Sequence, residues 1–387
     1  MINLKEAILK LSVFLGILIT IYLAFSIYAV SSSLSSGLII SPALKSHFET
    51  HKAKKQGQHV MGIITPNRRG EMQQAQMVQE AAEKMGQLSY IYGFNDLDMN
   101  LFIPAKYINE FIIKYLDYKY RTDFHLVMSF HVNLSLSEPN IMYISVPKKY
   151  LLNGKLEKFP TIANYSNFLD INLLNSNEEM MTELLNKKVK SAFGLVGVPA
   201  SLYKTSNHQN LVLFGSLWGR KSDGFYKAVN MLAAKDYMYF IKNPLLLLSS
   251  NSPQKFTENA NGPDGLQKTL NKYGIALCIH SDYHNKAGIP SSRIFEIISS
   301  GAIAISDRNP FVVKYFGNNI LYFDPHQSAE IIFKQIDDHV NWIRQNPKEA
   351  EKMARNAHKI IQDNFTTERF VEDAINFYSV IKEAKPA

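Results

Sequence analysis

Short apolar runs alternate with amphipathic stretches along most of the chain from residue 59 onwards. Runs such as VMGIITP, LSYIYGF and HLVMSF have the length of buried strands, whereas AKYINEFIIKYLDYKY repeats its apolar side chains at helical spacing. Strands that alternate with helices favour a mostly parallel sheet with helices on both faces. The pattern restarts near Asn210 with NLVLFGS and continues through IALCIHS and AIAISD. We therefore predict an α/β protein with two lobes, each built on a parallel sheet.

The length of the chain agrees with two lobes, because one hydrophobic core rarely grows beyond about 250 residues and this chain has 387. The restart of the pattern places the first lobe at residues 58–205 and the second at residues 206–366. The last part of the chain is three amphipathic stretches in a row, which predict three successive helices.

A run of twenty uncharged residues, 11–30, precedes the first lobe. A helix of that length crosses a bilayer core of about 30 Å. A cleaved secretory signal is the alternative, but its apolar region would be shorter, and Ile27 does not suit a small-x-small cleavage site before Ala29. We predict an uncleaved transmembrane anchor over residues 1–34 and a linker over residues 35–57.

The cations beside this run predict its orientation. Lys5 and Lys10 precede the run, and a larger cluster follows it at Lys45, Lys52, Lys54 and Lys55. Positive charge is retained on the cytoplasmic side. The sequence thus predicts a single-pass protein of the inner (cytoplasmic) membrane with its body in the cytoplasm. The basic stretch HKAKKQ is either a tether near anionic head groups or an ordinary solvated linker.

The amino-acid composition limits which kinds of functional site and partner the chain can have. The single cysteine, Cys278, excludes an intrachain disulfide and a thiolate metal cluster. The formal net charge of +8 suits an anionic membrane surface or a phosphorylated substrate. The basic residues are scattered and no nucleic-acid-binding motif occurs in the sequence, so we expect no nucleic-acid partner.

The strongest candidate site is IPSSRIFEIISSGAIAISD at residues 289–307. Ser291 or Ser292 can cap a helix whose free N–H groups attract a diphosphate. Arg293 adds a cation that can bind phosphate through two hydrogen bonds. Glu296, one turn into the helix, can accept hydrogen bonds from two vicinal ribose hydroxyls. The alternative for Glu296 is a solvated first-turn glutamate favoured by the helix dipole.

Two further loops follow predicted strands of the second lobe. In FGSLWGRKSDG, Gly215 and Ser216 come at the end of a strand, where glycine lets a ligand approach closely. Arg220 and Lys221 could then neutralise donor phosphates, although such pairs are also common on plain surface loops. In CIHSDYHNKAGIP at residues 278–290, we favour a loop that holds the base and diphosphate over a metal site.

The first lobe offers an acceptor or phosphate loop and a base. The turn NRRG, which is Asn67, Arg68, Arg69 and Gly70, follows the first strand. His131 follows the HLVMSF strand, and an imidazole near neutral pKa suits a general base beside an acceptor hydroxyl. A polar loop histidine without a role is the alternative. The D-x-D spacing at Asp96 and Asp98 is interpreted as an exposed loop.

The run from Pro290 to Glu296, with SSGAIAISD, NNILYFD and DNFTTERF after it, resembles the donor-binding half of group 1 glycosyltransferases of the GT-B fold. It is most similar to the branch with the motif S-x-R-x-F-E. The resemblance covers residues 210–378. It implies two Rossmann-like lobes that face a central cleft, and a last segment, residues 367–387, that packs back on the first lobe. Many retaining members carry a glutamate where this chain has Gly288, so the resemblance does not imply retention.

The resemblance implies a nucleotide-sugar donor as substrate, which we expect to be a UDP- or GDP-sugar. We expect no cofactor and no metal, because cations and a helix N-terminus can do what a divalent ion does elsewhere. The residues that we expect to contact the donor are Gly215, Ser216, Arg220, Lys221, His280, Lys286, Ser292, Arg293, Ile294 and Glu296.

We thus predict a metal-independent glycosyltransferase that acts on a membrane-associated glycan or glycolipid, so that its partners are the nucleotide-sugar and a membrane lipid or lipid-linked glycan. Two other classes remain open from the residues: a membrane-tethered two-lobed solute-binding protein, and a nucleotide-sugar epimerase of the same fold.

Overall fold

The computed structural model divides the chain into two compact units, Met1–Asn140 and Ile141–Ala387. The residues it describes are 37–50, 53–67, 69–94, 105–129, 132, 134, 136, 139–145, 165–171, 189–199, 204–215, 223–241, 255–258 and 265–383.

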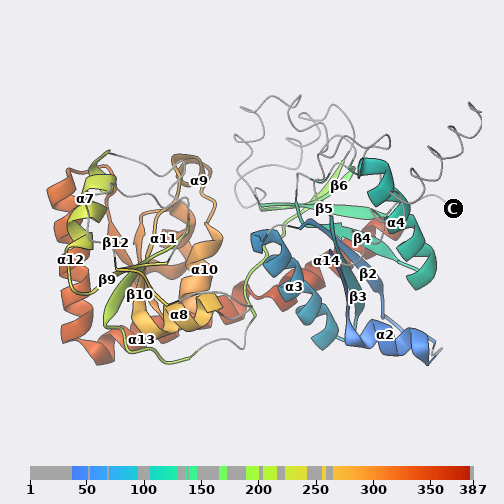
Figure 1. The fold of residues 1–387 in the computed structure, drawn as a ribbon, viewed down its shortest axis with the longest axis horizontal. Helices are drawn as coiled ribbons and strands as arrows, with labels where there is room; N and C mark the ends of the chain where they lie inside the picture. Colours follow the sequence, from blue (N-terminus) through green and yellow to red (C-terminus); the bar gives the residue numbers. More distant parts are fainter. Residues whose placement is uncertain are drawn as a thin grey trace, which may run out of the picture. The chain divides into compact units, whose positions relative to one another are not determined.

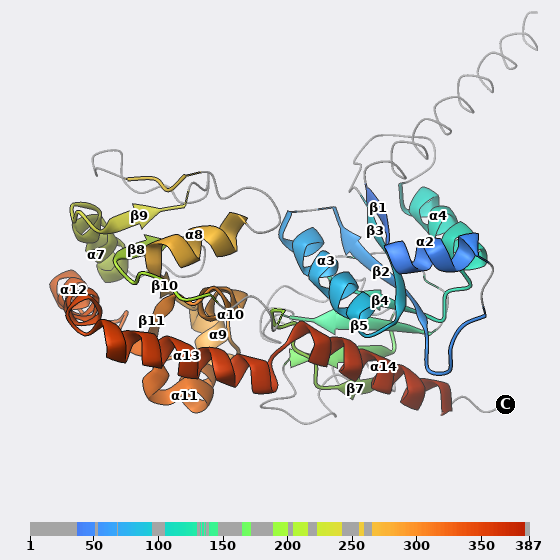
Figure 2. The same cartoon turned by 90° about the horizontal axis from the view of Figure 1, so that it is seen from below.

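The described part of unit 1 is built on four strands in the order β1-β3-β2-β4 (Figures 1 and 2). The strand β2 pairs in parallel with β3 and β4, whereas the short β1 pairs antiparallel with β3. Both central strands are buried along their whole length, which explains their nearly continuous apolar sequence. The strands are β1 (Leu38–Ile40), β2 (Val60–Pro66), β3 (Leu88–Phe94) and β4 (Phe124–Val127).

Within the described residues of unit 1, three helices accompany these strands: α2 (Pro42–Glu49), α3 (Arg69–Lys84) and α4 (Ala105–Tyr120). The helix α2 begins where sequence rules place a start, because the Ser41 side chain accepts a hydrogen bond from the backbone N–H of Leu44 and Pro42 occupies the first turn. The helix α3 packs on β2 and β3 through small side chains, among them Ala75 and Ala82, which are fully buried.

Unit 2 contains three parallel strands and a separate five-stranded sheet. The three strands are β5 (Asn140–Ile144), β6 (Asn167–Asp170) and β7 (Lys190–Ala192). The five-stranded sheet has the order β12-β11-β10-β8-β9, and all its neighbours are parallel. Its strands are β8 (Asn210–Leu213), β9 (Met238–Phe240), β10 (Gly274–Cys278), β11 (Ile303–Asp307) and β12 (Leu321–Phe323).

Helices cover both faces of the five-stranded sheet (Figures 1 and 2). Side chains alternate between the faces, so that Leu211 and Leu213 lie in one core and Val212 and Phe214 in the other. The first core is closed by α7 (Asp223–Ala233) and α12 (Ala329–Gln345). The second is closed mainly by α8 (Gly265–Tyr273), α10 (Ser292–Ser299), α11 (Pro310–Phe316) and α13 (Pro347–Asn364).

Two distant segments of unit 2 run side by side where α13 ends and α14 (Thr367–Glu383) begins. The backbone N–H of Thr367 donates to the carbonyl of Val198 over 3.2 Å. A side chain at Gly197 would overlap the carbonyl of Phe365, so glycine is required for this close approach. Phe370 of α14 then packs edge-on against Tyr143 of β5, with ring centroids 5.1 Å apart.

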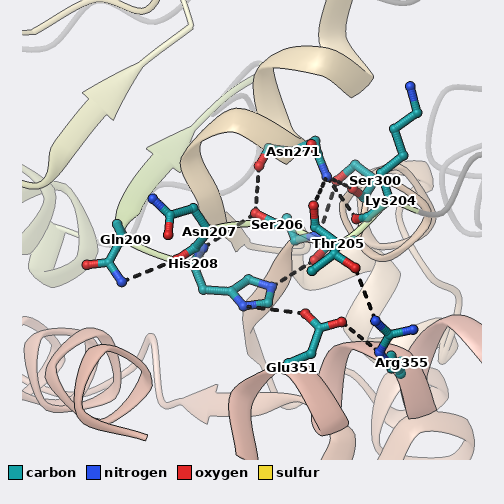
Figure 3. A network of polar contacts seen from close by, with 12 residues as sticks. Lys204, Thr205, Ser206, Asn207, His208, Gln209, Asn271, Ser300, Glu351 and Arg355 are labelled. Atoms are coloured by element: carbon teal, nitrogen blue, oxygen red, sulfur yellow. Dashed lines mark hydrogen bonds and ion pairs between the residues drawn. The ribbon is translucent and has the colours of Figure 1, made fainter. Parts of the chain in front are cut away.

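The segment that leads into β8 is fixed to the amino ends of the five-stranded sheet (Figure 3). Asn271 donates from Nδ2 to the carbonyls of Lys204 and Ser300, each over 2.8 Å. The imidazole Nε2 of His208 lies 2.9 Å from the carbonyl of Gly301. These contacts occupy the amino edge of the sheet, and ligands of parallel sheets bind at the opposite, carboxyl edge.

The parallel sheets and α/β layers are confirmed, but the predicted transmembrane helix, and with it the single-pass membrane localisation, is corrected. In the part of the chain that the structure describes, no helix is long and apolar enough to cross a bilayer. A crossing needs about 20 apolar residues, whereas α13, with 18 residues, carries charged side chains on its outer face. Residues 11–30, on which the prediction rested, lie outside the described residues. The lobe boundaries at residues 205 and 366 stay a prediction.

Replacing Gly301 by alanine should destabilise unit 2. Gly301 has φ +82°, and a Cβ there would overlap the carbonyl oxygen of Lys204. We expect the free energy of unfolding, measured by urea denaturation, to fall by roughly 2 kcal/mol or more through backbone strain and overlap. Gly86→Ala is the matched control, because its φ of +77° gives a similar backbone strain but nothing lies within 4 Å of the added Cβ. Equal losses in the two variants would contradict the role of the Lys204 contact.

Candidate functional site

The candidate site lies at the carboxyl edge of the five-stranded sheet, where the strand order reverses. The chain moves from β8 to β9 on one side and then places β10, β11 and β12 on the other. The loops after β8 and β10 therefore diverge, and such a switch point is where open α/β sheets bind ligands. Gly215 follows β8 here, His280 follows β10, and α10 begins shortly afterwards.

The start of α10 presents backbone N–H groups. Ser291 is the residue that precedes the helix, with extended backbone angles, and its side chain makes no capping hydrogen bond. The N–H of Ile294 already donates to the carbonyl of Ser291 over 3.1 Å. Ser292 is exposed in the first turn. The first N–H groups of a helix and its dipole together attract an anion.

The guanidinium of Arg293 lies against the turn that ends β8. Gly215 has φ +77°, and a Cβ at this position would lie 2.5 Å from Cζ of Arg293. The same Cζ lies 5.9 Å from the ring centroid of Phe214. The sequence predicted that Gly215 makes room for a ligand, and the structure shows that it makes room for Arg293. Phe214 was missed, although its place directly after a buried strand was a signal.

Glu296 lies one helical turn after Arg293 and is partly buried. Burial raises the pKa of the Glu296 carboxyl above its usual value, and the positive charge of Arg293 partly offsets this effect. Burial also lowers the pKa of the Arg293 guanidinium, which nevertheless stays a cation in proteins. Both side chains are partly buried on the same helix, and Glu296 is not a freely solvated surface residue.

A buried pair of side chains, His280 and Asp307, joins the ends of β10 and β11. The imidazole Nδ1 lies 2.7 Å from Oδ1 of Asp307, and both side chains are almost fully buried. A carboxylate only accepts hydrogen bonds, so Nδ1 carries the proton. Burial alone would raise the pKa of Asp307, but hydrogen bonds from His280 and Asn285 outweigh it and lower this pKa below its usual value.

Asn285 and Asn309 extend this network. Asn285 donates from Nδ2 to Oδ2 of Asp307 over 2.6 Å and accepts from Nδ2 of Asn309 over 2.9 Å. Asn309 also donates to the carbonyl of Ile289 and accepts from the N–H of Phe311, which caps α11. The loop after β10 is thereby fixed to the end of β11. Asp307 was missed as a network residue, although it ends the predicted strand AIAISD.

The structure separates the other predicted donor residues. His280 is buried in the network instead of lining an open surface, with Nε2 enclosed and without a hydrogen-bond partner among the described residues. Lys286 is exposed in the last turn of the short helix α9 (Asp282–Ala287). The side chain of Ile294 is fully buried in the core. Arg293 and Glu296 share α10, and Gly215 lies against Arg293.

Several predicted residues lie outside the described part of the chain: Arg68, His131, Ser216, Arg220 and Lys221. In unit 1, the N–H of Asn67 donates to the carbonyl of Phe94 over 2.8 Å, directly after β2. Gly70 is exposed in the first turn of α3, and Arg69 begins that helix. The roles of all these residues stay predictions.

The second half of the chain matches a known family. Residues 200–376 match the family model described as glycosyl transferase-like, and α10 with its Arg293 and Glu296 lies inside the match. The family domain in this half supports a glycosyltransferase enzyme. This result favours the predicted transferase over a solute-binding protein or an epimerase. No curated protein matches the sequence.

Solved structures show a GT-B-like fold for the glycosyltransferase. Sucrose-phosphate synthase from Thermosynechococcus elongatus aligns with a TM-score of 0.54 at 10% identity, over 85% of this chain and 100% of that one. HepE from Anabaena, solved with UDP-glucose, aligns with a TM-score of 0.56 at 10% identity, over 84% and 100%. WaaG, a glycosyltransferase involved in lipopolysaccharide biosynthesis, aligns with a TM-score of 0.51 at 12% identity, over 83% and 99%. The branch with the motif S-x-R-x-F-E stays a prediction.

Asp307→Asn should destabilise the glycosyltransferase in a pH-dependent way. The folded-state pKa of Asp307 is lowered, so its carboxylate stabilises the fold above the unfolded pKa of about 3.9, and this stabilisation is lost as pH falls through the folded-state pKa. We expect the urea-unfolding free energy to fall by about 2 kcal/mol near neutral pH, because Asn places a donor against Asn285. The deficit should shrink below about pH 4. Asp338→Asn, at an exposed side chain, is the control; an equal loss there would contradict the account.

Proposed function

We propose that this glycosyltransferase takes a sugar from a nucleotide-sugar donor, a UDP- or GDP-sugar, and transfers it to a membrane-associated glycan or glycolipid without a metal ion. The observation that carries the proposal is the position of Arg293 and Glu296, both partly buried, near the start of α10 at the carboxyl edge of the sheet. The HepE structure, which holds UDP-glucose in a similar fold, supports a nucleotide-sugar as donor.

The diphosphate of the donor is bound at the start of α10. The backbone N–H groups of Ser292 and Arg293 lie in the first turn, at the positive end of the helix dipole. The Arg293 guanidinium can donate two parallel hydrogen bonds to phosphate oxygens. Because Gly215 lets this guanidinium lie against the β8 turn, its position is set before the donor arrives.

The ribose is bound by Glu296. Its carboxylate lies one turn from the start of α10, and burial raises its pKa while Arg293 opposes that rise. Carboxylate oxygens that accept hydrogen bonds from two vicinal hydroxyls would stabilise the charged form further. The donor should therefore lower the pKa of Glu296 when it binds.

Metal independence follows from the cations of the chain. During transfer, negative charge develops on the departing nucleoside diphosphate, and fixed cations and helix N–H groups can stabilise it. Arg293 and the start of α10 supply these groups among the described residues. Arg220 and Lys221 are proposed to add to them, and His131 is proposed as the general base that takes the proton of the acceptor hydroxyl.

Gly288 bears on the stereochemistry of the transfer. This residue ends α9 with left-handed backbone angles, φ 64° and ψ 31°, which favour glycine over glutamate. The position at which many retaining relatives place a carboxylate is thus a helix-capping glycine here. This geometry supports a mechanism in which a base in the other lobe, rather than a carboxylate at residue 288, assists the transfer.

The membrane-associated acceptor is supported by charge and by one comparison. The net charge of +8 suits a phosphorylated or membrane-bound acceptor. WaaG, which has a similar fold, is described as acting in lipopolysaccharide biosynthesis. A glycan or glycolipid at a membrane is therefore the acceptor class that we propose.

Glu296→Gln should weaken donor binding without unfolding the protein. A thermal-shift screen of UDP-, GDP-, ADP- and CMP-sugars first identifies the preferred nucleotide-sugar, and calorimetry then measures its Kd. We expect this Kd to rise roughly ten- to a hundredfold in the variant, because two charge-assisted hydrogen bonds weaken. The matched control is Glu330→Gln, since Glu330 is also a glutamate near the start of a helix but is exposed on α12. An unchanged Kd in Glu296→Gln, or an equal rise in the control, would sink the assignment of the ribose to Glu296.

A further inference from the structure

The helix α4 of unit 1 exposes a stripe of aromatic side chains. Tyr107, Phe111, Tyr115 and Tyr118 have exposed fractions of 59%, 66%, 49% and 86%. Their spacing of four, four and three residues places them on one side of the helix. At about 1.5 Å per residue the stripe is roughly 16 Å long. This side of α4 is therefore an apolar surface open to the surroundings.

The stripe is not needed for the fold of unit 1. The opposite side of α4 already supplies Ile112, Ile113 and Leu116 to the core, each about 1% exposed. Among the described residues, ten large apolar side chains are markedly exposed, and four of them belong to this one stripe. Such gathering of apolar side chains marks a surface that contacts something else.

A cavity opens at the carboxyl end of the stripe. Its volume is about 800 Å³, and it lies between the end of α2, the start of β2 and the last turn of α4. Among the residues that the structure describes, aromatic rings and cations line it, and none of these lining residues is acidic. The lining residues are His47, Phe48, Ala53, Lys54, Val60, Tyr115, Tyr118, Lys119, Tyr120 and Arg121.

The acids of this region are engaged by neighbouring groups of unit 1. Asp117 accepts hydrogen bonds from the hydroxyl of Tyr90 over 3.1 Å and lies 2.8 Å from Nε2 of His125, which is buried. Asp123 binds the ammonium of Lys54 at 2.8 Å. Glu110 lies 3.8 Å from the ammonium of Lys106. Hydrogen bonds or lysine ammonium groups thus engage each of these three carboxylates.

The cations beside the stripe are exposed. Lys114, Lys119 and Arg121 are all solvent-accessible. The ammonium of Lys119 lies 5.9 Å from the ring centroid of Tyr115 and 5.2 Å from that of Tyr120. Long basic side chains can lay their stems along apolar surface while their charges reach outward. The stripe and its end cavity thus combine aromatic rings with positive charge.

We propose that this face, the aromatic stripe of α4 with its end cavity, binds the surface of an anionic phospholipid bilayer. Tyrosine rings favour the level of the lipid head groups, where one end is apolar and the other wet. Lys114, Lys119 and Arg121 supply the complementary charge to acidic head groups. The helix lies on the membrane and does not cross it. The inference goes beyond the proposed function, since no donor or acceptor chemistry enters it.

A local fluorescent probe on the stripe tests the proposal. The single native cysteine, Cys278, is buried, so a cysteine introduced as Tyr118→Cys can be labelled selectively in the full chain with an environment-sensitive dye. We expect the dye emission to shift to the blue with phosphatidylcholine vesicles that contain phosphatidylglycerol, to return in high salt, and to stay unchanged with pure phosphatidylcholine. The same dye at Lys334→Cys, exposed on α12, should not respond to either vesicle.

Charge-reversal variants test whether the cations beside the stripe contribute to lipid binding. Lys114→Glu with Lys119→Glu, added to the labelled protein, should raise the lipid concentration for half-maximal shift roughly tenfold or more, because each cation near the surface contributes to binding. Lys334→Glu with Lys359→Glu, at exposed positions of unit 2, is the matched pair and should leave it unchanged. The proposal would be overturned if the emission of the dye at position 118 did not change with acidic vesicles, or if it changed equally with neutral ones. A shift that depends on protein concentration alone, as in pairing of two copies, would also overturn it.

Discussion

The candidate donor site depends on one steric constraint, the packing of the Arg293 guanidinium against the turn at Gly215. A residue with a side chain at 215 would displace the guanidinium, and a left-handed φ of +77° already favours glycine there. This contact joins the carboxyl end of β8 to the start of α10, across the point where the strand order reverses. It places a fixed cation beside the first-turn N–H groups of α10 and one turn from the Glu296 carboxylate, an arrangement that suits a nucleoside diphosphate.

The side-chain hydrogen bonds at the two edges of the five-stranded sheet differ in what they hold in place. At the amino edge, Asn271 and His208 tie the incoming chain to backbone carbonyls (Figure 3). At the carboxyl edge, His280, Asp307 and Asn285 hold the loops after β10 and β11 in place by buried hydrogen bonds. These loops flank the start of α10. A site on α10 is thereby supported by rigid neighbours, and preorganised donors cost little reorganisation when a charged ligand binds.

Much of this architecture could be predicted from local pattern, and the rest depended on contacts between distant residues. Strands buried on both faces are continuous apolar runs, and the spacing from Ser291 to Glu296 already indicated a helix start that suits a phosphate. The burial of His280 could not be predicted, because its partner Asp307 is 27 residues away and a polar loop has the same sequence pattern whether it faces a core or a ligand. The exposed aromatic stripe on α4 was not predicted from the sequence, because the helical spacing of apolar residues indicates which side of a helix is buried and does not indicate whether its exposed side is also apolar.

The central claim is that α10 binds the diphosphate and ribose of the donor, and a crystal structure of the protein with a bound nucleotide-sugar tests it most directly. The account predicts the diphosphate at the first-turn N–H groups and the guanidinium of Arg293, with both ribose hydroxyls within hydrogen-bond distance of the Glu296 carboxylate. A nucleotide bound elsewhere on the protein, or one whose ribose makes no contact with Glu296, would contradict it.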